Sequence, residues 1–121
     1  MAAESTLYAM LSAHAGLAAL VGSGDAARIY PDALPEDCDY PAVVFSRSGT
    51  EPIATIDGTV HGAFVTVSVS CWGASRAEAD SAADAAESAL YAAGELPTAR
   101  VGAFDPEVGL FATSMEVTML T

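Results

Sequence analysis

The segment from Gly62 to Ala93 changes its hydrophobic period from two residues to nearly four within a few positions. Its first half predicts a strand, because valines alternate with hydroxyl side chains. One side of this strand carries Val65, Val67, Val69 and Cys71, and the other carries Thr66, Ser68 and Ser70. From Ser75 the apolar positions follow helical spacing: Ala79, Ala82, Ala83, Ala86, Ala89, Leu90 and Ala93. A one-sided strand that leads directly into a one-sided helix predicts a sheet with a helix packed on it.

The composition is that of one folded domain, which we expect to span residues 1–121. Hydrophobic residues make up 52% of the chain and charged residues 17%, unlike a disordered sequence. No apolar run approaches the roughly 20 residues that a membrane-spanning helix needs. The N-terminus also lacks the basic and apolar regions of a secretory signal. We therefore expect a protein that is made and used in a cytoplasm.

The charge of the chain excludes two classes of partner. The net charge is −12, with 16 acidic residues against four arginines and no lysine. Binding to nucleic acid depends on cations that neutralise phosphates, and an anionic membrane repels an acidic protein. We expect neither DNA binding nor membrane binding. The cysteines, Cys38 and Cys71, are interpreted as a loop thiol and a buried thiol, with a disulfide as the alternative.

The sequence before Gly62 predicts a helix, a short extended segment and a strand. Apolar residues at helical spacing cover Ser5 to Val21, and Gly22-Ser23-Gly24 is suited to ending this helix. Arg28 to Pro31 is the extended segment, and the acidic stretch that follows it to Asp39 is expected to be a surface loop. A strand should run from Pro41 to Ser48. The connection from Gly49 to Gly62 contains the turn pair Asp57-Gly58 and is expected to be either an extended hairpin arm or a mobile loop.

The remaining elements complete the layer. Ser75 and Glu78 fit a capping box at the start of the second helix, and Gly94 is placed to end it. Strands are expected near Ala99 to Phe104 and from Leu110 to Leu120. In the last strand Phe111, Met115, Val117 and Met119 lie on one side, and Ser114, Glu116 and Thr118 on the other.

This order predicts an α+β fold, a mainly antiparallel sheet of four to five strands with two helices packed on one face. The other face carries Thr66, Ser68, Ser70, Ser114, Glu116 and Thr118. We expect this polar face to be either solvated or covered by another subunit.

The sequence supplies no pattern typical of an active site. His14 lies on the apolar side of the first helix, where we expect a partly buried, hydrogen-bonded histidine, and His61 is expected to be solvated. Gly22-Ser-Gly-Asp25 follows a helix instead of a strand, so it is not a phosphate loop, and the acids at positions 32–39 lack calcium-loop spacing. No Gly-x-Ser-x-Gly, His-Glu-x-x-His or Cys-x-x-Cys pattern is present. We predict no catalytic, metal-binding or cofactor-binding residue, no cofactor, and a protein that is not an enzyme.

Four segments of the chain together carry a resemblance to a known protein family. The first is an N-terminal helix followed by Leu20-Val21-Gly22 and Arg28-Ile29-Tyr30-Pro31. The second is Tyr40 to Ser46. The third runs from Glu51 through Asp57-Gly58 and Ser70-Cys71-Trp72 into the helix that opens Ala-Ser-Arg-Ala-Glu-Ala. The fourth is Phe104-Asp105-Pro106-Glu107 with Gly109-Leu110-Phe111. The four segments in this order cover nearly the whole chain. Together they resemble the tail terminator, or tail-completion, proteins of long-tailed bacteriophages and prophages.

The resemblance implies a structural virion protein and no residue-level motif. Such proteins form a ring, typically of six copies, at the head-proximal end of the tail tube. The ring stops tube growth and provides the surface for joining the head, and DNA passes through its centre without specific binding. The implied partners are copies of the chain itself, the major tail tube protein and a head-completion or connector protein.

The surfaces left over after one core is built are the candidates for these contacts. The candidate subunit or tube interface is the arm, namely Glu51, Pro52, Ile53, Ile56, Asp57, Gly58, Val60 and His61. One hypothesis for the net negative charge is an acidic ring lumen that repels DNA. The alternative is that the charge serves solubility alone. The alternatives are another head–tail connector or tube component, and a small ligand-binding α+β domain that uses the Asp32 to Asp39 loop.

Overall fold

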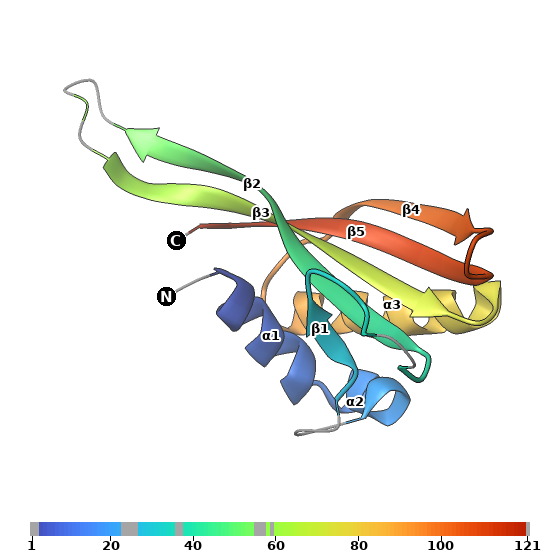
Figure 1. Cartoon of the computed structure of the whole chain (residues 1–121). Coiled ribbons are helices and arrows are strands. Elements are labelled where there is room, and N and C mark those ends of the chain that lie inside the picture. Colours follow the sequence, from blue (N-terminus) through green and yellow to red (C-terminus); the bar gives the residue numbers. More distant parts are fainter. Residues whose placement is uncertain (1–2, 23–26, 36–37, 55–57, 59, 121) are drawn as a thin grey trace.

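The computed structural model describes residues 3–22, 27–35, 38–54, 58 and 60–120 (Figure 1). Five strands form one sheet in the order β1-β2-β3-β5-β4. The pair β1 and β2 is parallel and the other three pairs are antiparallel. The helices all lie on one face of the sheet (Figure 1), so the predicted α+β class is confirmed.

The elements follow each other along the chain with short connections. The helices are α1 (Ala3–Ala13), α2 (Ala15–Val21) and α3 (Arg76–Ala92). The strands are β1 (Ile29–Pro31), β2 (Ala42–Ala54), β3 (Val60–Gly73), β4 (Thr98–Asp105) and β5 (Leu110–Leu120). None of the helices in the described ranges is long and apolar enough to cross a membrane.

The predicted single helix from Ser5 to Val21 is wrong, because His14 divides it into α1 and α2. The backbone of His14 is extended (φ −82°, ψ 119°), and its Nδ1 accepts a hydrogen bond from the Leu17 N–H at 3.2 Å. The imidazole thus caps α2, as an N-cap side chain does. The fold therefore has three helices on the sheet instead of two. His14 is half-buried and hydrogen-bonded, as predicted.

The apolar residues predicted for one helix remain buried on both sides of this break, because both helices pack on the same core. Leu7 and Leu11 from α1 and Leu17 and Val21 from α2 are completely buried. Gly22 ends α2 with a positive φ of 87°, and its N–H donates to the carbonyl of Ala18 at 2.8 Å. A single smooth stripe in the sequence is consistent with either one helix or two, so the spacing alone cannot reveal the break.

The helix α3 is seated closely on β3 and β5 because its buried face is almost entirely alanine. Ala79, Ala82, Ala83 and Ala86 have no exposed surface. At the β3–α3 junction a Cβ on Gly73 would lie 2.6 Å from the backbone nitrogen of Ala79, so only glycine fits there. Ser75 caps the helix by accepting from the Glu78 N–H at 3.1 Å, and Glu78 accepts from the Ala74 N–H at 3.0 Å.

The capping box is therefore confirmed, with the glutamate bonding one residue before the cap. The other end of α3 differs slightly from the prediction. The helix stops at Ala92, and Ala93 is exposed instead of belonging to the buried stripe. Gly94 follows with a φ of +85°, the left-handed conformation expected after a helix end.

The strands β2 and β3 are longer than predicted. Most of the predicted connection from Gly49 to Gly62 belongs to them, and their pairing continues to Ala54 opposite Val60. The prediction of a hairpin arm is thus confirmed for the paired residues, and the contact of the arm with a neighbour stays a prediction. In β5, Met115, Val117 and Met119 are buried as predicted, but Thr113 shares their face and is 2% exposed.

The two cysteines are free thiols, and burial makes one of them inert. Cys71 is fully buried on the helix-covered face of β3, and this burial raises its pKa to about 12. The thiol interpretation is therefore confirmed and the disulfide alternative is wrong.

The close seating of α3 predicts that its buried face does not accept larger side chains. Ala86→Leu adds three carbons where Ala86 has no exposed surface. We expect the free energy of unfolding to fall by about 1–3 kcal/mol. Ala77→Leu, at an exposed position of the same helix, is the matched control and should change it by about 0.5 kcal/mol or less. Urea denaturation of both variants measures the difference, and equal effects would show that the alanine face is loosely packed.

The raised pKa of Cys71 predicts a loss of stability in alkaline solution. Between pH 9 and pH 12 the unfolded chain releases the thiol proton while the folded chain retains it, so unfolding becomes easier as pH rises. Unfolding measured across this range should show a steeper decline for the native chain than for Cys71→Ala. Parallel curves for the two proteins would contradict the burial of a neutral thiol.

Candidate interaction surface

The most extended surface of the chain is the arm, residues 49–62, in which β2 and β3 run beyond the rest of the sheet (Figure 1). Within the described residues, the pairing of β3 with β5 ends at Phe64 opposite Leu120, whereas β2 and β3 stay paired to Ala54 and Val60. The helices lie under the body of the sheet, and the far end of the arm projects away from them (Figure 1).

The structure describes some of the predicted interface residues and not others. Glu51 and Pro52 are exposed on β2, and Ile53 is half-buried. Gly58 is exposed and has a φ of +85°, which suits a turn. Val60 and His61 belong to β3, but their side chains are outside the described part. Ile56 and Asp57 lie outside the described residues altogether.

A β-bulge at the root of the arm exchanges the two faces of β2. Arg47 pairs with Val67, but the next paired residue, Gly49, faces Thr66, so Ser48 is the additional residue. Before the bulge the odd-numbered residues of β2 face the helices. After it, Glu51 lies opposite Phe64 on the side of the sheet that the helices do not cover.

This uncovered side, which we call the open face, has hydroxyl groups along its middle. Thr66 and Thr118 lie 3.2 Å apart across β3 and β5, and Ser70 and Ser114 lie 3.0 Å apart. Ser68 is in register with Glu116. The six predicted polar residues therefore do share one face. Four of their five hydroxyls are hydrogen-bonded to one another in these two pairs.

The open face carries a hollow at each end. At the root of the arm, a hollow of about 550 Å³ is lined by Gly49, Thr50, Glu51, Phe64, Thr66 and Thr118, and the Phe64 side chain is 45% exposed. The second hollow, at the opposite end of the sheet, we call the Trp72 hollow. Its volume is also about 550 Å³, and its lining is Leu34, Pro35, Tyr40, Trp72, Asp105, Val108 and Leu110.

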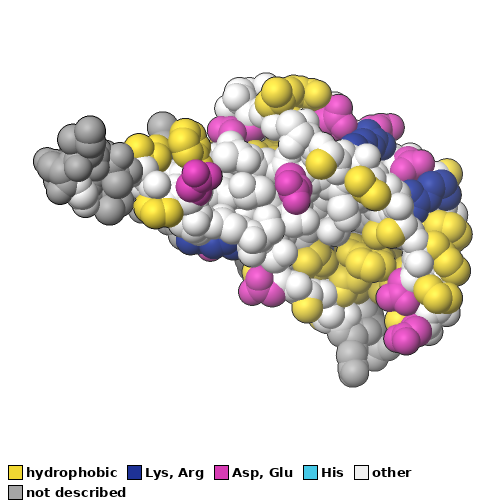
Figure 2. Space-filling model, turned by 90° about the horizontal axis from the view of Figure 1, so that it is seen from above, with side chains coloured by type: hydrophobic (Ala, Val, Ile, Leu, Met, Phe, Trp, Pro, Cys, Tyr) yellow, Lys and Arg dark blue, Asp and Glu magenta, His cyan; other side chains and the backbone are white. Residues whose placement is uncertain are grey.

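Sequence reasoning missed the Trp72 hollow, although one signal pointed to it. Trp72 has the same phase along β3 as Thr66, Ser68 and Ser70, so the alternation already placed a large aromatic side chain on the open face. The loop before β2 brings Tyr40 to it, which the sequence could not show. Hydrophobic side chains gather at the end of this face away from the arm (Figure 2).

All four arginines are engaged within the chain. Arg28 donates to the carbonyls of Pro41 and Leu20 at 2.9 and 2.7 Å, which ties the end of α2 to the start of β2. Arg47 forms an ion pair with Glu4 of α1 at 2.8 Å. The surface charge of the protein is therefore dominated by carboxylates.

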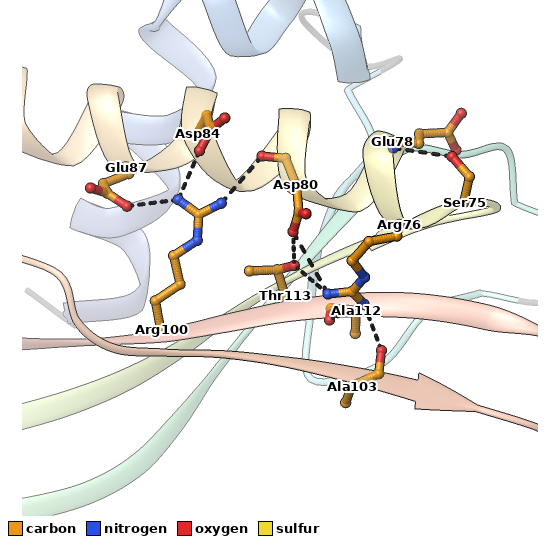
Figure 3. Close-up of polar contacts among 10 residues, drawn as sticks. All are labelled: Ser75, Arg76, Glu78, Asp80, Asp84, Glu87, Arg100, Ala103, Ala112 and Thr113. Carbon is orange, nitrogen blue, oxygen red and sulfur yellow. Dashed lines mark hydrogen bonds and ion pairs between the residues drawn. The ribbon is translucent and has the colours of Figure 1, made fainter.

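The other two arginines fasten β4 and β5 to α3 (Figure 3). Arg76 donates to the carbonyls of Ala103 and Ala112 at 2.7 and 2.9 Å and to the Thr113 hydroxyl at 3.2 Å. The Thr113 hydroxyl in turn donates to Asp80 at 2.7 Å.

Arg100 donates to Asp84 at 2.8 Å and to Glu87 at 3.1 Å, and the bond to Asp84 contributes most to raising its pKa. This network has the appearance of a small charged site. Its members satisfy one another, and it holds the β4–β5 hairpin in place.

The described residues gather no set of metal ligands, and the ring of His14 is engaged in the fold. No three His, Cys, Asp or Glu side chains within them gather as metal ligands would. The His14 Nδ1 is occupied by capping α2. The arm and the open face are the extended surfaces that the described residues present.

Comparison with known protein families identifies the family of the chain. A family model described as tail completion protein gp17 matches residues 5–110. The chain therefore belongs to the tail-completion protein family, and it is a structural protein of phage-like tails.

A solved structure extends the likeness in fold. A chain from the virion of a native gene transfer agent particle superimposes with a TM-score of 0.71 and 24% identity, covering 98% of this chain and 93% of the other. At this identity the match supports the fold and nothing finer. The search of curated proteins gave no match.

The engagement of every arginine predicts that the protein does not bind DNA. Binding requires free cationic groups near the phosphates, and here a net charge of −12 opposes it. A gel-shift titration with duplex DNA at low salt should show no retarded band up to micromolar protein. A salt-sensitive shift would contradict the assignment of the arginines to internal contacts.

Proposed function

We propose that the chain caps the head-proximal end of the phage tail tube as a closed ring, with six copies as the expected number. The ring ends tube growth and provides the surface on which the head joins. The observation that carries this proposal is membership in the tail-completion family over residues 5–110. The proposed partners are other copies of the chain, the major tail tube protein and a head-completion or connector protein.

The arm supports the ring. A two-stranded ribbon without further strands or a helix beside it is only marginally stable in water, so contact with a neighbour stabilises it. The arm projects from one end of the sheet only (Figure 1), so the surface with which a subunit reaches one neighbour differs from the surface that it offers to the other neighbour. Contacts between unlike surfaces repeat head-to-tail, and they close into a ring when the rotation between neighbours divides a full turn. The proposed contact residues are Glu51, Pro52, Ile53, Ile56, Asp57, Gly58, Val60 and His61, with Phe64 added at the root.

The charge supports the passage of DNA. With carboxylates outnumbering arginines 16 to four, a ring of such subunits repels the phosphate backbone and lets DNA slide without adhering. We place the finished ring in the virion, at the head-proximal end of the tail, and its assembly in the host cytoplasm.

Deletion of the gene from the phage or prophage tests this role. We expect over-long tails without attached heads, seen by electron microscopy, and rescue when the native chain is supplied from a plasmid. Tails of normal length would contradict a terminator and favour another head–tail connector, and loss of all tubes would favour a tube component.

The same deletion host tests the arm. Phe64→Ser removes an aromatic side chain that is 45% exposed, so it should leave the thermal unfolding midpoint nearly unchanged but fail to rescue. The matched control is Tyr91→Ser on α3, at a side chain that is 51% exposed, and it should rescue fully. Equal rescue by both variants would remove the arm root from the interface.

A further inference from the structure

The Trp72 hollow has the properties of a docking site for one protruding side chain. Trp72 and Tyr40 are half-buried, so their rings are held by the fold while part of each stays accessible. Leu34 and Leu110 add aliphatic surface, and Val108 on the rim is 61% exposed. Tryptophan and tyrosine in a partly enclosed hollow are the residue types that dominate binding energy at protein interfaces.

Carboxylates occur in the lining of this hollow and in the turn and the loop that form it. Asp105 lines the hollow, and Glu107 lies two residues further in the same turn, where its N–H donates to the Asp105 carboxylate at 3.0 Å. Asp39, next to Tyr40, and Asp32, in the same loop, are exposed. Figure 2 shows acidic side chains beside the hydrophobic ones at this end of the open face.

The arginines of the chain do not neutralise this rim. Arg47 forms an ion pair with Glu4 near the arm, and Arg28 donates to the carbonyls of Leu20 and Pro41. Arg76 on α3 donates to the carbonyl of Ala112 on β5, and Arg100 on β4 forms ion pairs with carboxylates of α3. The site therefore combines an apolar centre with the carboxylate of Asp105 and with further exposed carboxylates in the adjoining turn and loop. It is complementary to an apolar side chain that has positive charges beside it.

A second copy of the chain cannot supply such a segment. It has no lysine, its four arginines are occupied as described, and it brings a further charge of −12. We propose that the Trp72 hollow binds a segment of a different protein, in which a hydrophobic side chain is flanked by lysine or arginine. The hydrophobic side chain enters between Tyr40 and Trp72, and the flanking cations meet the carboxylates and the aromatic rings. That the carrier is another virion protein rests on the proposed function, but the chemistry of the segment does not.

A photocrosslinker at the rim tests the proposal. A benzophenone amino acid in place of Val108 is placed in the full chain, which is supplied to cells that produce the particles, and the cells are irradiated before lysis. The crosslinked peptide is then sequenced by mass spectrometry. We expect a peptide from a different protein with lysine or arginine within a few residues of the crosslinked hydrophobic position.

The contribution of the rim is measured with matched variants. Glu107→Gln removes one exposed carboxylate at the hollow and should lower the crosslink yield by about two- to fivefold, the range of a single exposed ion pair. Glu116→Gln removes an exposed carboxylate from the middle of the same face and should leave the yield unchanged. The same photocrosslinker in place of Phe64 instead of Val108 reports the contacts of the arm independently.

Three results would overturn the proposal: a peptide from another copy of this chain, a partner peptide without basic residues, or no crosslink at Val108 while Phe64 crosslinks. Failure of the proposed function looks different. In that case the basic, apolar peptide is recovered but its parent protein is absent from purified particles.

Discussion

The packing of α3 on β3 and β5 is the contact on which the other features depend. Because Ala79, Ala82, Ala83 and Ala86 bring the helix close, one face of the sheet is sealed. Gly73 permits the turn between β3 and α3 at this short separation. Arg76 and Arg100 then fix the β4–β5 hairpin to the same helix. The open face and the arm are therefore the parts of the sheet that remain free to meet another protein.

The sequence predicted the layer well where one residue pattern had one structural meaning. The switch at Gly62 to Ala93, the cap at Ser75 and the turn at Gly94 all occur as expected, because alternation, capping and left-handed glycine are local properties. The break at His14 could not be predicted, because a histidine side chain replaces a backbone bond without disturbing the apolar spacing. The burial of Thr113 could not be predicted either, because its hydroxyl bonds to Asp80 and Arg76, which are 33 and 37 residues away.

The candidate surfaces were predicted less completely than the fold. The arm was recognised from its turn and its remaining apolar residues, but the bulge at Ser48 and the exposure of Phe64 depend on the pairing of two strands. The Trp72 hollow joins a strand, a turn and a loop that are up to 76 residues apart, from Leu34 to Leu110. A lysine-free composition was plain from the start. Its consequence for binding depends on the fold, because each arginine is engaged in a contact inside the chain.

The additional residue at Ser48 has a consequence for how such a protein can change over evolutionary time. It separates the alternation of the arm from the alternation of the body, since odd positions of β2 face the helices on one side of it and face away on the other. Loss of that residue would leave the arm residues opposite the same partners on β3 and the core side chains in place, while it removed the bend and the additional twist that the bulge gives the arm. A lineage could thus re-aim its projecting ribbon toward a new neighbour while the folded body stays unaltered.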